Sequence, residues 1–545
     1  MTGLVSPDIR PDHWIYVGWL LVVYGTISLA LALIGTHDDL TNPVRIFFRR
    51  ISNALRQGTG YPGWSMAGAL SGLAMLGTAA MGLYWDVAWH IDLGRDRELF
   101  TPSHVMILIG LGGLIFAAFI TAVFATNDEA DVGMRIGSAR IPWSAVSLGA
   151  LGIGGLAAFP FDVLWHEAYG IDITLWSPSH LMLVGGGGLA TVSLWLMMAE
   201  ARRHAEPTWI GKGIEGFIVG TVLVGVSAFQ GEFDFGVPQF QVLYWPLLVV
   251  IAAGLTLVTA RIGLGRGGAL AAVAGFLVVR GIIAVLVGVS LNHTVPRFPL
   301  YLGAALAVEA VALWLGTDNR VRFAIAAGLG IATFGLGAEL VWADASGWFT
   351  PTGASLFTKV AVLAPLAAIA AALLGAGLSR AFGGERVPGW MLGAAGAVLV
   401  AVLAFPLPRN VGDVEAVIRL RPADSGLAAD AAGDGGVKQA TVEIDLQPPD
   451  AARGAVAFGV TSWQGGGRLS AALEETAPGR YVASRPLPIG GDWKTTVGLF
   501  RGDQVMAAPV YLPADESIGA SEIPAVAERR TRFVRNTTLL LREVS

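Results

Sequence analysis

Cysteine is absent from this chain of 545 residues. Its absence excludes disulfide bonds, thiolate metal ligands and a cysteine nucleophile. Charged residues are also scarce, at 14% of the sequence, where a globular protein carries about 25%. The net charge of -5 is accompanied by no basic patch and no base-stacking motif, which excludes a nucleic acid as partner.

Long apolar segments are what the sequence has instead. Hydrophobic residues make up 54% of it and the mean hydropathy is +0.61. Runs of roughly twenty apolar residues are long enough to cross a bilayer as helices. No cleavable signal pattern precedes the first run, so we expect it to be retained. We predict twelve spans, near residues 14–34, 65–88, 103–125, 143–165, 179–200, 213–232, 240–260, 268–291, 298–316, 321–342, 356–379 and 389–408.

Lysine and arginine predict how these spans are oriented. Every second loop is basic and the loops between them carry few positive charges, which places the basic loops in the cytoplasm. We therefore expect a multi-pass protein of the plasma (inner) membrane, with everything after Pro408 outside the cytoplasm. The fifteen residues of the basic loops are Arg45, Arg49, Arg50, Arg56, Arg135, Arg140, Arg202, Arg203, Lys212, Arg261, Arg266, Arg320, Arg322, Arg380 and Arg386.

The chain divides into regions of different character. Residues 1–410 form the predicted helical domain, with repeat units near 65–125 and 143–200. Residues 411–513 alternate apolar and polar residues between Gly/Pro turns, a pattern typical of a small β-sandwich. Residues 514–545 are expected to be a tail, partly helical or disordered. The predicted fold class is a polytopic α-helical membrane protein with a C-terminal extracytoplasmic β-sandwich.

One motif occurs twice in the helical domain. Taking Asp86 as the first position, eleven of 21 residues recur unchanged at a separation of 76 residues, with no gap. Such self-similarity indicates an internal repeat. The polar members of the two copies are Asp86, His90, Asp96, Ser103 and His104, and Asp162, His166, Asp172, Ser179 and His180.

The spacing within the motif predicts a metal site. Aspartate and histidine four residues apart lie on one face of a helix. The second histidine follows a Thr-Pro or Ser-Pro pair that starts the next helix, where the helix dipole keeps an imidazole neutral. Each helical hairpin thus offers one carboxylate and two imidazoles at its outer end, a set that suits Cu(II), zinc, iron or manganese. The candidate ligands are Asp86, His90, His104, Asp162, His166 and His180, and the candidate acceptors for their far ring nitrogens are Asp96, Glu98, Glu167 and Asp172.

Three other interpretations of the motif stay open. The histidines belong to an interfacial belt of polar and aromatic side chains, or form a proton-relaying cluster without metal, or ligate haem in pairs. Four of the chain's eight histidines fall in the motif, which favours a metal.

Charged residues also occur inside the later predicted spans. Arg280 and Glu309 fall at similar predicted depth on adjacent spans, and buried membrane charges are usually paired. We predict that they form a structural ion pair, with part of a proton or ion path as the alternative. The later hairpins keep polar residues at their outer ends, namely Glu232, Asp234, Asn292, His293, Glu339 and Asp344.

The duplicated Asp-x3-His-x13-His motif resembles that of the C subunit of the copper membrane monooxygenases, the particulate methane and ammonia monooxygenases. The resemblance implies a copper site at Asp86, His90 and His104, and another at Asp162, His166 and His180. It also implies an oxygenase that acts on a small apolar substrate and works with additional membrane subunits. This chain departs from the family in having aspartate first in both sets, more spans and a fused β-domain.

The segment APGRYVASRPLPIGGDWKTTVGL resembles the YtkA/FixH-type β-sandwich domains, which are often attached to membrane proteins of copper handling. Both resemblances imply copper, with zinc or iron as alternatives. The sequence leaves two other functions open. One is transport or delivery of copper or another divalent metal, and the other is a haem or quinone redox protein.

Overall fold

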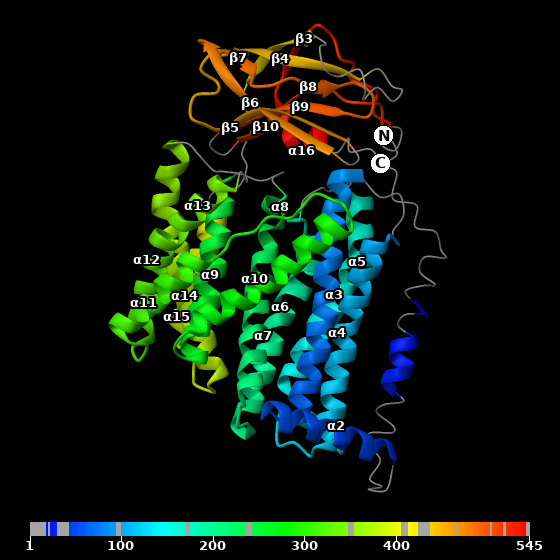
Figure 1. Ribbon diagram of the computed structural model, residues 1–545, viewed down its shortest axis with the longest axis vertical. Coiled ribbons are helices and arrows are strands. Elements are labelled where there is room, and N and C mark those ends of the chain that lie inside the picture. Colours follow the sequence, from blue (N-terminus) through cyan, green and yellow to red (C-terminus); the bar gives the residue numbers. More distant parts are fainter. Residues whose placement is uncertain are drawn as a thin grey trace.

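The computed structural model has helices in its N-terminal three quarters and strands in its C-terminal quarter (Figure 1). More than half of the predicted first span, 14–34, lies outside the described residues. The structure describes residues 18–19, 22–29, 43–93, 100–169, 175–235, 242–346, 354–404, 413–422, 437–464, 467–501, 504–515 and 519–540.

Nine helical stretches in the described part of the chain are long and apolar enough to cross a membrane, and each coincides with a predicted span. Two apolar helices, α11 and α15, are shorter. The protein is therefore a multi-pass membrane protein. The helices are α3 (Gly63–Leu93), α4 (Pro102–Asn127), α5 (Trp143–Tyr169), α6 (Pro178–Ala201), α7 (Trp209–Ser227), α8 (Gly231–Asp234), α9 (Tyr244–Leu264), α10 (Gly268–Val285), α11 (Leu302–Leu315), α12 (Arg320–Gly330), α13 (Leu336–Ala345), α14 (Ala354–Phe382) and α15 (Gly389–Ala404).

Short irregular turns complete several of these stretches. The 3-10 turns η1 (Arg202–His204) and η2 (Ala228–Gln230) follow α6 and α7. The π-helical turns η3 (Leu286–Ser290) and η4 (Ile331–Gly335) extend α10 and join α12 to α13.

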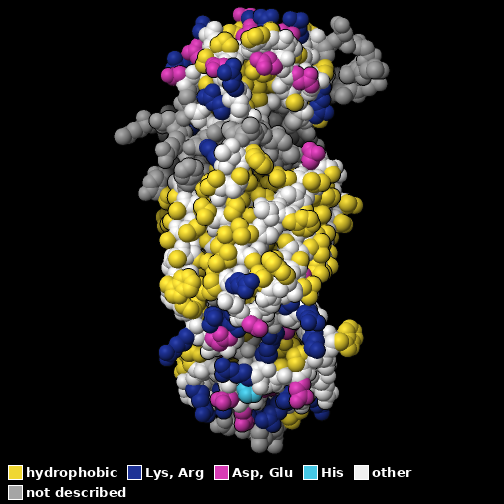
Figure 2. Space-filling view, turned by 90° about the vertical axis from the view of Figure 1, so that its left-hand side faces the viewer, with side chains coloured by type: hydrophobic (Ala, Val, Ile, Leu, Met, Phe, Trp, Pro, Cys, Tyr) yellow, Lys and Arg dark blue, Asp and Glu magenta, His cyan; other side chains and the backbone are white. Residues whose placement is uncertain are grey.

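Hydrophobic side chains form a broad band around the middle of the helical part, on the face seen in Figure 2. Charged side chains gather below this band and on the β-domain. A band of this kind is expected of a surface that faces lipid, because apolar side chains cost least there.

Helices α3 to α6 rise from one end of the helical domain to the other, where the β-domain sits (Figure 1). The end beside the β-domain is called the domain end, and the opposite end is called the α2 end. Helix α2 (Pro43–Thr59) lies across the α2 end and is amphipathic. Its Arg45 and Arg49 approach Glu129 at 3.5 and 3.8 Å. The sequence had shown this segment only as a basic loop.

Glycine permits close packing of the repeated helices at two crossings. A Cβ atom added to Gly186 of α6 would lie 2.6 Å from the Cα of Gly155 in α5. The same distance separates a Cβ on Gly220 of α7 from the Cα of Gly275 in α10. Any larger side chain would force these helices apart, as expected for small residues at membrane helix contacts.

The β-domain is built from antiparallel strands. Their order is β11-β3-β4-β7-β6-β5-β9-β10-β12, with β8 paired to β4. Strand β6 pairs with β5 along its first half and with β7 along its second, so it joins the two halves of the domain. The strands are β3 (Glu415–Pro422), β4 (Lys438–Gln447), β5 (Ala455–Gln464), β6 (Gly467–Ala477), β7 (Arg480–Ala483), β8 (Leu487–Ile489), β9 (Lys494–Arg501), β10 (Gln504–Tyr511), β11 (Glu528–Arg532) and β12 (Val534–Arg535). A separate hairpin of β1 (Met134–Ile136) and β2 (Ala139–Ile141) connects α4 to α5.

The apolar residues of the alternating pattern predicted from the sequence form the core of this domain. In β4, Val442 and Ile444 are fully buried while Glu443 between them is half-buried. They pack with Val497 and Leu499 of β9, a sandwich-like arrangement.

The prediction of a tail over residues 514–545 was wrong for its middle part. Strand β11 pairs with β3 over five residue pairs, and β12 pairs with β10. Helix α16 (Asn536–Leu540) follows. The physical reason is that β3 and β10 would otherwise leave unpaired edges, and covering such edges prevents unwanted strand pairing.

The two domains touch at the domain end. Strand β5 contacts α3, and Phe500 of β9 packs against the hydrophobic core of the helical domain. The end of α3 that carries the first motif therefore lies beside the β-domain.

Candidate metal centre

Helix α3 carries the first two residues of the first motif near the domain end. Asp86 and His90 are one helical turn apart, so their side chains share a face. His90 Nε2 is 3.7 Å from Asp86 Oδ2. The two side chains are 31% and 16% exposed, so the pair is partly shielded from solvent.

His104 reaches the same carboxylate from the first turn of α4. Thr101 caps this helix, accepting a hydrogen bond from the His104 backbone N–H at 3.4 Å, and Pro102 follows in the first turn. This local geometry, which the sequence predicted, brings His104 Nε2 to 3.0 Å from Asp86 Oδ1.

Ser103 orients the shared carboxylate. Its Oγ donates a hydrogen bond to Asp86 Oδ1 at 2.8 Å and lies 3.1 Å from Thr101 Oγ1. Ser103 and Thr101 are both buried. Reasoning from the sequence missed this role, although Ser103 is one of the residues that recur unchanged in the repeat.

The three side chains fit a metal ion. One ligand atom from each of Asp86, His90 and His104 lies within 4.8 Å of the others. Two ligands bound at 2.0–2.1 Å in a tetrahedral site are about 3.3 Å apart, and the distances of 3.0 and 3.7 Å lie on either side of that value. Two imidazoles and one carboxylate leave further coordination positions for water or substrate.

An aromatic side chain of a third helix packs against the cluster. Phe159 of α5 meets the His104 ring nearly edge-on, with ring centroids 6.3 Å apart and an interplanar angle of 83°. This apolar contact shields part of the site from water and strengthens electrostatic interactions there.

The second motif repeats this geometry in part. His180 Nε2 is 3.6 Å from Asp162 Oδ1, and Ser177 caps α6 as Thr101 caps α4. The side chain of His166 is outside the described part of the chain. The structure therefore brings together two of the three predicted ligands of this copy.

The predicted acceptors for the histidine rings fall outside the described part of the chain. They are Asp96, Glu98 and Asp172, together with the side chain of Glu167.

The predicted pair of Arg280 and Glu309 is not the one that forms. Arg280 Nη2 is 2.8 Å from Asp234 Oδ2, with both side chains almost fully buried. Glu309 instead meets Arg261 at 2.8 Å and accepts backbone N–H groups at the turn that opens α10. The prediction rested on a similar depth of the two residues in adjacent spans, but α11 has only 14 residues and its Glu309 lies level with the turn that opens α10.

Polar groups of the later hairpins hold the domain end together. Glu232 accepts the backbone N–H of Leu175 at 2.7 Å. Glu339 accepts that of Leu300 at 2.8 Å. His293 Nδ1 lies 3.0 Å from Asp92 Oδ2, on a different face of α3 from Asp86. Where the first two hairpins carry candidate ligands, these carry structural contacts.

The fold and this site define a class, a multi-pass helical membrane protein with an Asp/His/His cluster beside an extramembrane β-domain. No family model matches the chain, and no curated protein or solved structure is detectably similar to it.

Proposed function

We propose that this protein is a membrane metalloenzyme of the copper-dependent oxygenase type, or a subunit of one, acting on a small apolar substrate. The observation that supports the proposal is the convergence of Asp86, His90 and His104 from two helices on one point. The resemblance of the motif to the copper membrane monooxygenases supplies the metal and the reaction type. Bound copper would supply the activation of dioxygen.

The surrounding residues have distinct tasks in this proposal. Asp86 offsets part of the metal's charge, and Ser103 holds the carboxylate in the orientation that two imidazoles require. The first turn of α4 places the His104 ring against Asp86 Oδ1, where it can share a metal ion with that carboxylate. Phe159 presents an apolar wall to a substrate that arrives from lipid.

The proposal includes a position in the membrane. We infer twelve spans in the plasma (inner) membrane, with the basic loops of the α2 end in the cytoplasm and the β-domain outside. The candidate centre then lies near the outer boundary of the bilayer.

Transport of a metal ion is the main rival, and the described contacts favour it less. A transporter needs a polar path to the α2 end. The candidates for such a path are Arg280, Glu309, Glu339 and Lys359, and the first three are engaged by Asp234, Arg261 and backbone N–H groups. Groups held in this way are suited to structure, so a fixed site is the better interpretation.

Metal analysis of three proteins tests the proposal. The native chain, His104→Ala and His204→Ala would be purified in detergent and measured for bound copper, zinc and iron. His204 is an exposed histidine of η1, outside the motif, and so controls for general loss of a histidine. We expect stoichiometric copper in the native chain and in His204→Ala, and loss of the copy-one metal in His104→Ala.

Each outcome has a clear meaning. Equal metal content in His104→Ala and the native chain would refute the ligand assignment. Zinc or iron in place of copper would keep the site and discard the copper oxygenase. A native chain without metal would overturn the proposal.

A further inference from the structure

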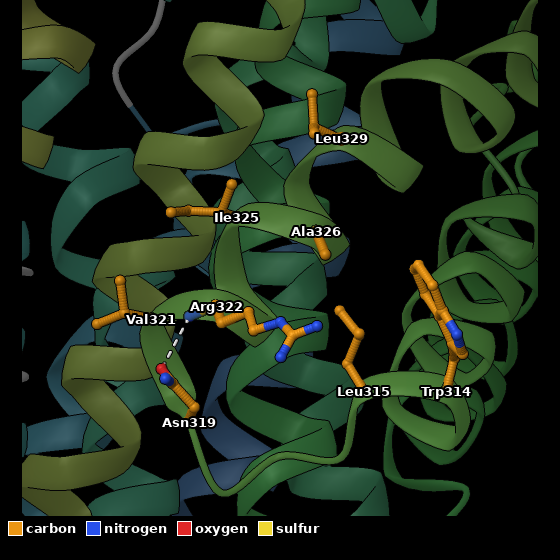
Figure 3. Close-up of a pocket in the computed structure, with 8 residues that line it drawn as sticks. All are labelled: Trp314, Leu315, Asn319, Val321, Arg322, Ile325, Ala326 and Leu329. Carbon is orange, nitrogen blue, oxygen red and sulfur yellow. Dashed lines mark hydrogen bonds between the residues drawn. The ribbon is translucent and has the colours of Figure 1, made fainter.

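An open groove of about 460 Å³ lies at the end of the helical domain opposite the β-domain. One wall is the end of α11 and the other is α12, as Figure 3 shows. The residues that line it and carry the argument are Trp314, Leu315, Arg322, Ile325, Ala326 and Leu329. None of them belongs to the candidate metal centre.

The lining along α12 changes from charged to apolar in one direction. Arg322, Ile325 and Leu329 follow each other at spacings of three and four residues, so they form one stripe of the helix. Seven residues of helix rise about 10 Å. The stripe therefore begins with a guanidinium at the loop and continues with alkyl side chains toward the apolar band.

Arg322 is the charged member and its guanidinium is available. The backbone N–H of Arg322 donates a hydrogen bond to the side-chain oxygen of the cap residue Asn319 at 3.1 Å. Within the described ranges, no carboxylate lies at ion-pair distance from its guanidinium. The nearby carboxylate of Glu385 is shared by Arg320 at 2.6 Å and Arg380 at 3.3 Å. Arg322 thus brings to the mouth of the groove one positive charge that no ion pair in the described ranges offsets.

The apolar walls are open to the surroundings. Trp314 is 80% exposed and Leu329 is 45% exposed, although both are strongly hydrophobic. Tryptophan at the end of a membrane helix is typical of the lipid–water boundary. Ala326 leaves space between these side chains (Figure 3).

We propose that this groove binds one anionic phospholipid of the membrane. The lipid phosphate meets Arg322 at the mouth, and an acyl chain lies along Ile325 and Leu329 under the edge of Trp314. The groove is charged at its mouth and apolar further along α12. A phospholipid likewise has a charged head group followed by apolar acyl chains. Basic pockets between membrane helices recognise anionic head groups by this charge complementarity. The site is independent of the metal centre.

Lipid retention by the full chain tests the proposal. Delipidated protein in neutral detergent would be given equal amounts of palmitoyl-oleoyl phosphatidylglycerol and phosphatidylcholine, and retained lipid would be counted by native mass spectrometry. We expect the native chain to retain one phosphatidylglycerol in preference to phosphatidylcholine by roughly fivefold. Arg322→Gln, which keeps the side chain's size, should lose the preference.

Two further variants keep the test specific. Arg266→Gln removes an exposed arginine that does not line the groove, and it should retain the preference. Ala326→Phe fills the groove while leaving Arg322 in place, and it should lose the bound lipid. Equal retention of the two lipids by the native chain would overturn the proposal. So would an equal effect of Arg266→Gln and Arg322→Gln, because retention would then depend only on overall charge.

Discussion

At the scale of single residues, the carboxylate of Asp86 is the centre of the candidate site. Its Oδ1 faces His104 and accepts a hydrogen bond from Ser103, while its Oδ2 faces His90. A carboxylate held on both oxygens is limited to one orientation. Partners that orient a ligand in this way strongly affect metal affinity in other proteins.

Replacing Ser103 by alanine should weaken metal binding without unfolding the chain. We expect metal affinity to fall by about 10–100-fold, because Asp86 loses the hydrogen bond that fixes it. Isothermal titration calorimetry, in which metal ion is added to the metal-free protein, measures this change in affinity.

Ser71→Ala is the matched control, because Ser71 lies on the same helix and donates only to carbonyl groups of its own turn. Equal affinity in Ser103→Ala and Ser71→Ala would show that Ser103 does not orient the ligand.

At the scale of elements, α3 presents two functional faces. One carries Asp86 and His90 toward α4. The other carries Tyr84, whose hydroxyl donates to Asp234 at 3.2 Å, and Asp92, which accepts from Thr294. Arg280 of α10 joins the second face, with its guanidinium 3.8 Å from the centre of the Tyr84 ring. The helix that supplies two of the candidate ligands is thus fixed by a buried polar cluster behind it.

Removing one partner of the buried pair should be costly. Arg280→Met leaves Asp234 without its ion-pair partner in a nearly closed environment, which typically costs about 3–5 kcal/mol. The double variant Arg280→Met/Asp234→Leu removes both charges and should recover most of that loss. Unfolding in detergent, followed by circular dichroism, measures both variants.

Arg320→Met serves as the control, because its partner Glu385 is 44% exposed. We expect a change of less than about 1 kcal/mol there, since exposed pairs contribute little. A double variant as unstable as the single one would mean that packing around the side chains, and not the charge, dominates.

At the scale of the whole molecule, the arrangement of two domains predicts a definite topology. The absence of native cysteine makes this testable with single introduced cysteines. Ser484→Cys lies on the β-domain and Asp318→Cys at the α2 end, and both positions are exposed. Because the basic loops are expected in the cytoplasm, a membrane-impermeant maleimide should label Ser484→Cys in intact cells. It should label Asp318→Cys only after the membrane is permeabilised.

The native chain, which has no thiol, provides the background. The reverse labelling pattern would place the β-domain inside the cell and would move the candidate metal centre to the inner boundary of the membrane.

Local sequence determined much of this molecule. Apolar runs specify helices that must satisfy their own backbone in lipid, and the nine long helices begin and end within a few residues of the predicted spans. Thr101-Pro102 and Ser177-Pro178 start helices because a capping oxygen and a fixed φ act over a few residues. The meeting of Asp86, His90 and His104 followed from two such local rules at once.

Only the tertiary structure decided which distant groups meet. Arg280 pairs with Asp234 and not Glu309, because the lengths and offsets of helices set the depth of each charge. Strand β11 completes the sheet at β3, because an unpaired edge attracts whichever strand can reach it. Both outcomes depend on contacts between segments far apart in the chain. Composition and periodicity describe each segment by itself, so they cannot determine its partner.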